Sequence, residues 1–252
     1  MCTHDRTRRA PAARLAAAIA AAAVLLGLGP PGDAAARLLV PMDLAQSDHL
    51  RAYGVAYHAL ELGETAEWLL NYRGGSFLLA DTPANRQELQ LAGVRFEPLS
   101  GGDEAGLYGE IAEQNMQAIL LEKAPRIAVY APPEDVIEPW DDAVMLALEY
   151  AEIPYDRIYD EEVLAGRLDE YDWLHLHHED FTGQYGKFYA SFRNAEWYRL
   201  RQQAMEAHAR AAGFAKVWQH KQASALAIRE YVARGGFLFA MCSGGDSFDI
   251  AL

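Results

Sequence analysis

A single cysteine near the end of the chain has the surroundings of a nucleophile. Cys242 ends an apolar run, residues 236–241, and precedes a small, polar turn, residues 243–247, after which residues 248–252 have a helical composition. A strand, a sharp turn and a helix lift a nucleophile above the end of a sheet. The free N–H groups and positive dipole end of such a helix stabilise a thiolate and an oxyanion. Cys242 is therefore a candidate nucleophile; a buried cysteine at a strand end is the alternative.

A segment rich in histidine and carboxylates could supply the base that a thiol needs. Residues 175–180 read His-Leu-His-His-Glu-Asp at the end of a strand-like run. An imidazole that is oriented by a carboxylate commonly converts a thiol to a thiolate at neutral pH. We take His177 or His178 as the candidate base and Glu179 or Asp180 as its orienting carboxylate.

The same segment allows other interpretations. Its three histidines and two carboxylates could bind zinc, but the spacing differs from the H-x-H-x-D-H pattern of exported metal hydrolases, so we expect no metal and no cofactor. His175 on its own is expected to be a buried strand residue whose ring is hydrogen-bonded to backbone. The backbone N–H groups of Ser243 and Gly244 are the candidate oxyanion donors.

The second half of the chain predicts the sheet that positions these residues. Four apolar, strand-like runs alternate with helical patterns and short links, which predicts β-α-β units and a parallel sheet. The runs are residues 126–130, 154–159, 172–177 and 236–241. The carboxyl ends of parallel strands meet at one edge, where ligands bind. Cys242 and the histidine segment are therefore expected to line one cleft for a small-molecule substrate.

The chain divides into two predicted α/β units. A smaller first unit covers residues 37–123, with a hairpin predicted where two apolar runs flank Arg73-Gly74-Gly75, and with a helical pattern from residue 103 to about 121. The second unit covers residues 124–252 and is expected to be a three-layer α/β domain. Its last helical pattern stops without a cap, so the chain is expected to be the N-terminal part of a longer protein.

Residues 1–36 are expected to be a signal peptide. Four arginines precede an alanine- and leucine-rich run that is too short for a good membrane span, and Ala34-Ala35-Ala36 offers a cleavage site. The mature chain, from Arg37, would have 18 basic and 34 acidic side chains, a formal charge of −16. This charge argues against nucleic acid and anionic lipid as partners. We expect a periplasmic or secreted protein without stable membrane association, whose only cysteine is Cys242.

Three runs resemble a known superfamily. Residues 154–156, 171–174 and 235–244 resemble, in this order, segments of the class I glutamine amidotransferase-like superfamily, in which a cysteine elbow follows a Gly-Gly-led strand. The resemblance implies a flavodoxin-like parallel sheet, with Cys242 as a nucleophile for amide or ester cleavage or transfer. In that superfamily the histidine and glutamate partners lie downstream of the cysteine. Its Gly-Gly at the end of the third strand is replaced here by His178-Glu179.

A longer set of runs resembles a family of exported bacterial proteins that carries the name asparagine synthetase B. The runs are residues 140–143, 151–156, 171–189 and 239–243. The name implies an alternative function, an ATP-dependent amidotransferase. Residues 243–247 are similar to the Ser-Gly-Gly-x-Asp-Ser pyrophosphate loop of such enzymes, with one residue missing. A non-catalytic binding protein for sugar or peptide, using the same sheet edge, is the alternative from another class.

Overall fold

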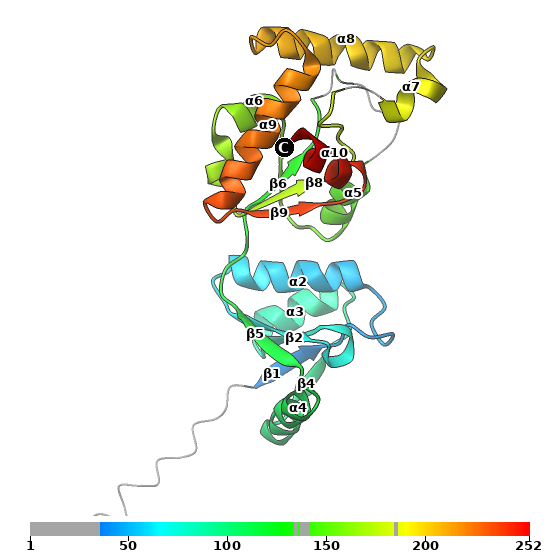
Figure 1. Cartoon of the computed structure of the whole chain (residues 1–252). Helices are drawn as coiled ribbons and strands as arrows, with labels where there is room; N and C mark the ends of the chain where they lie inside the picture. The colour runs from blue at the N-terminus through cyan, green and yellow to red at the C-terminus, as the bar shows by residue number, and fades with distance from the viewer. Residues whose placement is uncertain (1–35, 134–135, 137–141, 184–185) are drawn as a thin grey trace, which may run out of the picture.

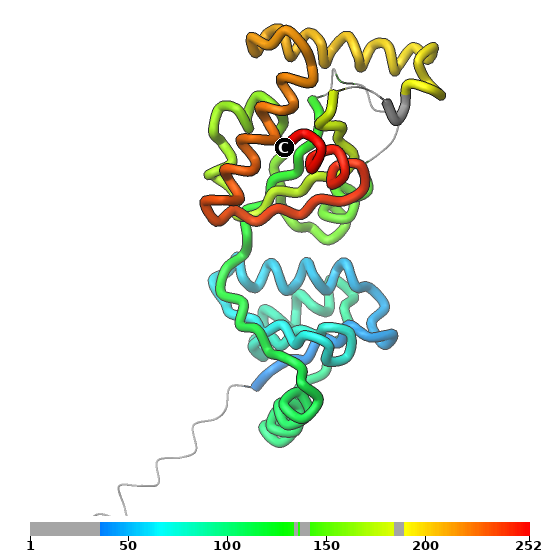
Figure 2. Tube along the Cα trace, in the orientation of Figure 1, coloured from blue at the N-terminus to red at the C-terminus, as the bar shows by residue number. Residues whose placement is uncertain are grey.

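The computed structural model describes residues 36–252 except residues 134–135, 137–141 and 184–185, and it describes no side chain of residues 186–188. The predicted signal peptide, including Cys2, lies outside the described residues. Two sheets divide the described chain, one within residues 37–121 and one within residues 127–240 (Figure 1). The chain passes from the first sheet to the second through a short segment after residue 121 (Figure 2).

The first unit is built on an antiparallel sheet. Its described strands follow the order β4-β1-β3-β2-β5, and each neighbouring pair is antiparallel. The strands are β1 (Arg37–Val40), β2 (Ala66–Leu70), β3 (Ser76–Ala80), β4 (Glu97–Leu99) and β5 (Gln117–Leu121). The helices are α2 (His49–Glu61), the short η1 (Tyr72–Gly74), α3 (Pro83–Leu91) and α4 (Gly101–Glu113). The first four strands and their helices form a β-α-β-β-α-β arrangement, the split β-α-β motif.

Alternation along the strands gives this sheet two buried faces. Leu38 and Leu79 pack beneath α2 and α3, whereas Leu39 and Leu78 pack with α4 on the opposite face. Successive side chains of a strand point to opposite faces, so both faces of β1 and β3 need a helical cover. The predicted hairpin is confirmed as β2 and β3.

The predicted helix from residue 103 to about 121 is wrong in its second half. α4 ends at Glu113, and Asn115 has a φ of 55°, a left-handed conformation that a helix does not continue through. The following residues form β5, which pairs with β2 along its whole length. This strand is set by hydrogen bonds to a segment about fifty residues earlier, so the local pattern gave no indication of it.

The second unit contains the predicted parallel sheet. Its described strands follow the order β7-β6-β8-β9, and each neighbouring pair is parallel, which confirms the α/β class and the β-α-β pattern. The strands are β6 (Ile127–Tyr130), β7 (Asp156–Ile158), β8 (Trp173–Leu176) and β9 (Phe237–Ala240). The helices are α5 (Ala143–Tyr150), α6 (Asp160–Leu164), the short η2 (Arg167–Glu170), α7 (Gly186–Phe192), α8 (Glu196–Ala211), α9 (Val217–Ala233) and α10 (Ser243–Ala251).

Helices cover both faces of the parallel sheet, giving the three layers that were expected. Ile127 and Val129 pack with Leu148 of α5 on one face. Leu174 and Leu176 pack with residues of α6, α9 and α10, such as Ile228, on the other face. No helix in the described part of the chain combines the length and apolar character that crossing a membrane requires.

The two units touch through α2 and α5. A Cβ added to Gly54 of α2 would lie 2.0 Å from the carbonyl oxygen of Ala151, so the two backbones meet there without room for a side chain. Tyr57 donates a hydrogen bond to the carbonyl of Pro125 at 2.9 Å, and Arg51 forms an ion pair with Glu152. Glycine is required at this close approach because any larger residue would separate the units.

Candidate functional site

Cys242 lies on a strained turn between β9 and α10. Its φ of 52° and ψ of −141° are a conformation that an L-residue with a side chain rarely adopts, and it is the N-cap residue of α10. Such a backbone costs of order 1–3 kcal/mol and persists where the surrounding structure holds it. The thiol is exposed. The predicted strand before Cys242 and the helix after it are therefore confirmed, but the predicted turn over residues 243–247 is wrong, because α10 already begins at Ser243. The alternative of a buried cysteine is also wrong.

Hydrogen bonds join this turn to the end of β8. The N–H of Gly244 donates to the carbonyl of His177 at 2.8 Å, and Ser243 Oγ donates to the carbonyl of His178 at 2.9 Å. Ser247 Oγ is 2.8 Å from the carbonyl oxygen of Glu179. Cys242 and the histidine segment thus share the carboxyl edge of the sheet. The prediction that they line one cleft is not decided by these contacts and stays a prediction.

The bond from Gly244 limits the predicted oxyanion donors. Its N–H already has an acceptor, and a Cβ at this position would lie 2.6 Å from the His177 carbonyl oxygen, so only glycine permits the contact. Of the two N–H groups predicted to stabilise an oxyanion, that of Gly244 instead holds the turn against β8. The N–H of Ser243 is therefore the remaining candidate oxyanion donor of the two.

His177 faces a carboxylate that the sequence did not single out. Its Nδ1 is 3.5 Å from Oδ2 of Asp142, and both side chains are 9% exposed. This distance suits an ion pair but exceeds the usual length of a hydrogen bond. The ring also stacks on that of His178, with 3.5 Å between centroids. Asp142 lies in the connection from β6 to α5, which places it on the same sheet edge as His177.

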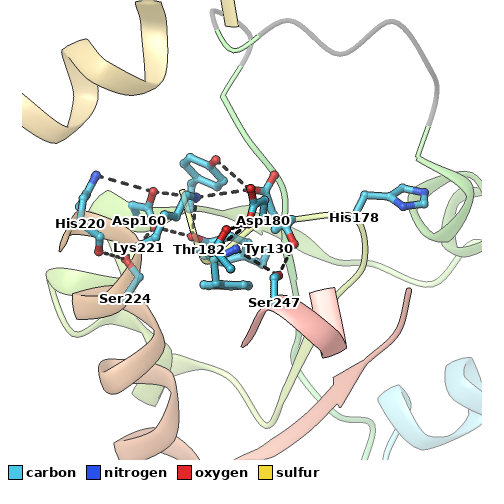
Figure 3. Close-up of polar contacts among 12 residues, drawn as sticks. Tyr130, Asp160, His178, Asp180, Thr182, His220, Lys221, Ser224 and Ser247 are labelled. Atoms are coloured by element: carbon cyan, nitrogen blue, oxygen red, sulfur yellow. Dashed lines mark hydrogen bonds and ion pairs between the residues drawn. The ribbon is translucent and has the colours of Figure 1, made fainter. Parts of the chain in front are cut away.

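Glu179 does not orient a histidine, which corrects that expectation. Its carboxylate accepts hydrogen bonds from Tyr159 OH at 3.0 Å and from Lys221 Nζ at 3.3 Å. His177 continues the alternation of His175 on the α5 face of the sheet, whereas Glu179 is directed to the α6 and α9 side. In Figure 3 the ring of His178 lies well apart from Lys221 and Asp160.

Asp180, the other candidate orienting carboxylate, bonds within its own turn. Its Oδ1 accepts hydrogen bonds from the N–H of Thr182 at 2.9 Å and from Thr182 Oγ1 at 2.5 Å. Both contacts are local and shape the turn that follows β8 (Figure 3).

Lys221 is the centre of a buried polar cluster that sequence reasoning missed. Its side chain is 1% exposed, and Nζ lies 2.9 Å from Oδ2 of Asp160 and 3.3 Å from Oε2 of Glu179. Nζ also lies 3.9 Å from the centre of the Tyr159 ring. Burial raises the pKa of the Asp160 carboxyl, but the charge of Lys221, the neighbouring His220 and the hydrogen bonds from Ser224 and Tyr130 together outweigh it, so that pKa is lowered overall. Through Glu179, the cluster holds the segment that follows β8.

His175 is buried, as expected, but not bonded to backbone. Burial, with repulsion from His177, lowers its pKa to about 4, so the ring is neutral at pH 7. Neither ring nitrogen has a hydrogen-bond partner among the described residues, which corrects the expected backbone bond. The ring instead stacks on that of Phe239, with 5.4 Å between centroids.

Among the residues described, no three histidine, cysteine, aspartate or glutamate side chains are grouped to hold a metal ion. Comparisons of this chain with models of protein families, with curated proteins and with solved structures find no match.

Proposed function

We propose that the protein is an exported, amidotransferase-like enzyme in which Cys242 is the nucleophile for cleavage or transfer of an amide or ester. The observation that carries the proposal is the exposed Cys242 thiol on a backbone with a φ of 52°, directly between a parallel strand and the first turn of α10. A nucleophile on a strained strand-to-helix turn is presented to substrate above the sheet. A structural cysteine gains nothing from that strain.

The strand order supports an amidotransferase-like fold. Numbered within the second unit, β7-β6-β8-β9 is the order 2-1-3-4, which is how flavodoxin-like sheets are arranged. In such sheets ligands bind outside the carboxyl ends of the strands. Cys242, His177 and Asp142 all follow the carboxyl ends of strands, so the substrate is expected to bind above them.

The chemistry proceeds through a thioester. An imidazole, that of His177 or His178, takes the thiol proton, and the sulfur attacks the acyl carbon of the substrate. The N–H of Ser243 is the proposed donor to the developing oxyanion. The leaving amine or alcohol departs with the proton from the imidazole. Water or a second nucleophile then breaks the thioester and restores the thiol.

The conformation of residues 243–247 favours this function over an ATP-dependent synthetase. These residues form the start of helix α10 rather than an open loop. The Gly244 N–H is bonded to His177, and the buried Ser247 Oγ accepts from the N–H of Phe181 at 3.1 Å. A pyrophosphate loop needs its N–H groups free for phosphate oxygens.

Thiol alkylation tests the proposal. Iodoacetamide should modify Cys242 at pH 7 at least roughly tenfold faster than it modifies a cysteine in an unstructured peptide, because a neighbouring imidazole base activates the thiol as a nucleophile. Cys242→Ser should abolish labelling and also any burst of product from a chromogenic thioester or ester. Alkylation at the rate of the peptide, with no burst, would favour a binding protein. Mass spectrometry of the exported protein should show Arg37 at its N-terminus.

A further inference from the structure

We infer that Asp142 positions His177, through Nδ1 of the ring, as the base for Cys242. That Cys242 is the residue from which His177 takes a proton rests on the proposed function. The pairing of Asp142 with His177 rests on geometry alone, because the two side chains come from different strand ends and meet in a nearly enclosed place.

The capping contacts of Asp142 fix its carboxylate. Oδ1 accepts hydrogen bonds from the N–H groups of Val144 at 2.8 Å and Met145 at 3.1 Å, which satisfies the first turn of α5. Oδ2 takes no part in the cap and is the oxygen 3.5 Å from His177 Nδ1. One oxygen is therefore anchored to backbone while the other faces the imidazole.

The two nitrogens of His177 differ in their surroundings. Within the described structure, Nδ1 is the ring atom that is both enclosed and without a hydrogen-bond partner. A carboxylate beside Nδ1 favours the tautomer with its proton there, which leaves the lone pair on Nε2. That is the protonation state a general base needs. A movement of about 0.5 Å would turn the 3.5 Å contact into a hydrogen bond, and catalytic contacts are often this long before substrate binds.

Among the described residues, no other group around the His177 ring competes with Asp142 for this role. Its neighbours on the sheet edge are His178, stacked at 3.5 Å, and His175, at 6.2 Å between centroids. His175 is neutral because burial lowers its pKa to about 4. The carboxylate of Glu179 is bound to Lys221 on the other side of the sheet. Asp142 is thus the carboxylate that the described contacts bring to this imidazole.

Asp142→Asn separates the positioning role from the capping role. Asparagine caps a helix as well as aspartate does, so α5 is retained. Its amide can donate to Nδ1, which a carboxylate cannot, and that reverses the preferred tautomer. We expect the ¹⁵N spectrum of the neutral His177 ring to change from the Nδ1–H to the Nε2–H form, and the alkylation rate of Cys242 at pH 7 to fall roughly tenfold or more.

A matched control uses a carboxylate on the same helix. Glu149 of α5 accepts a hydrogen bond from Tyr155 OH at 2.9 Å and makes no described contact with His177. Glu149→Gln should leave the tautomer and the alkylation rate unchanged.

The outcomes distinguish the inference from the proposed function. An unchanged ¹⁵N spectrum in Asp142→Asn overturns the inference, whatever the reactivity of Cys242. The inference is also overturned if Cys242 is alkylated rapidly in the parent protein and at the same rate in Asp142→Asn. A third outcome is also informative: Asp142→Asn switches the tautomer, but Cys242 of the parent protein reacts no faster than the peptide cysteine. This result supports the pairing of Asp142 with His177 and overturns Cys242 as the nucleophile.

Discussion

Removing the charge of Lys221 is expected to destabilise the second unit severely. Lys221 lies beneath the carboxyl edge of the sheet, between two carboxylates that are themselves buried, those of Asp160 and Glu179. Lys221→Met keeps most of the aliphatic stem and removes only the ammonium group. The two carboxylates then share the same dry site without a cation between them.

The magnitude follows from what remains around each carboxylate. Removing one partner of a buried ion pair typically costs about 3–5 kcal/mol. Asp160 keeps a hydrogen bond from Ser224 at 2.6 Å, and Glu179 keeps one from Tyr159 at 3.0 Å. Arg201 also remains 3.7 Å from Glu179. These contacts hold the loss in the free energy of unfolding to about 3–5 kcal/mol instead of twice that value, which is still a large share of the stability of a domain.

The loss should depend on pH in a defined direction. In the parent protein the pKa of Asp160 is lowered, so its contribution is present above the unfolded value near 3.8 and is lost as pH falls. Without Lys221, burial is opposed by His220 and by the hydrogen bonds to Asp160, so that pKa is expected to rise from its lowered position. The folded variant then binds a proton on Asp160 at a higher pH than the folded parent does. The difference between variant and parent should therefore shrink from pH 7 toward pH 4, by up to about 1.4 kcal/mol per pH unit.

Amide hydrogen exchange in β6 and β8 measures this effect within the second unit, with urea unfolding as the global measure. Arg229→Met is the control: it lies on the same helix, but its ion pair with Glu230 is exposed, so it should cost at most about 1 kcal/mol. Adding Asp160→Asn and Glu179→Gln to Lys221→Met should recover much of the loss. A loss below about 1 kcal/mol at pH 7, or one that does not change with pH, would refute the reasoning.

Three further changes probe the sheet edge and the contact between the units. His175→Phe should flatten the pH dependence of the free energy of unfolding between about pH 6.5 and pH 4. In the parent protein His175 takes up a proton in that window when the chain is unfolded, whereas the folded ring, with its pKa of about 4, does not. Denaturant midpoints at several pH values measure this. Gly244→Ala should slow Cys242 alkylation, since its Cβ would meet the His177 carbonyl at 2.6 Å and shift the turn. Gly54→Ala should cost about 1–3 kcal/mol in thermal unfolding through overpacking between the units, and an unaltered melting temperature would contradict the contact. Mg-ATP should bind no more tightly than about millimolar, ~4 kcal/mol, in calorimetry.

Local sequence patterns determined the main elements and the setting of Cys242. The apolar run before the cysteine and the small residues after it lie next to one another in the chain, so the strand and the helix on either side of Cys242 could be recognised without knowledge of any distant contact. The hairpin of β2 and β3 was predictable for the same reason. The alternation of strand and helical patterns also predicted the parallel sheet, because β-α-β connections require it.

Tertiary structure alone decided which polar residues meet. Asp142 and His177 are far apart in the chain and are joined only when β6 and β8 pair in register. Glu179 is two residues from His177, yet its carboxylate lies on the opposite side of the sheet, bound to Lys221. A lysine in a helical pattern gives no indication that it will be 1% exposed. Local sequence predicted most of the helices and strands, although β5 depends on its pairing with β2. The burial of a charge and the partner that compensates it depend on how distant segments pack.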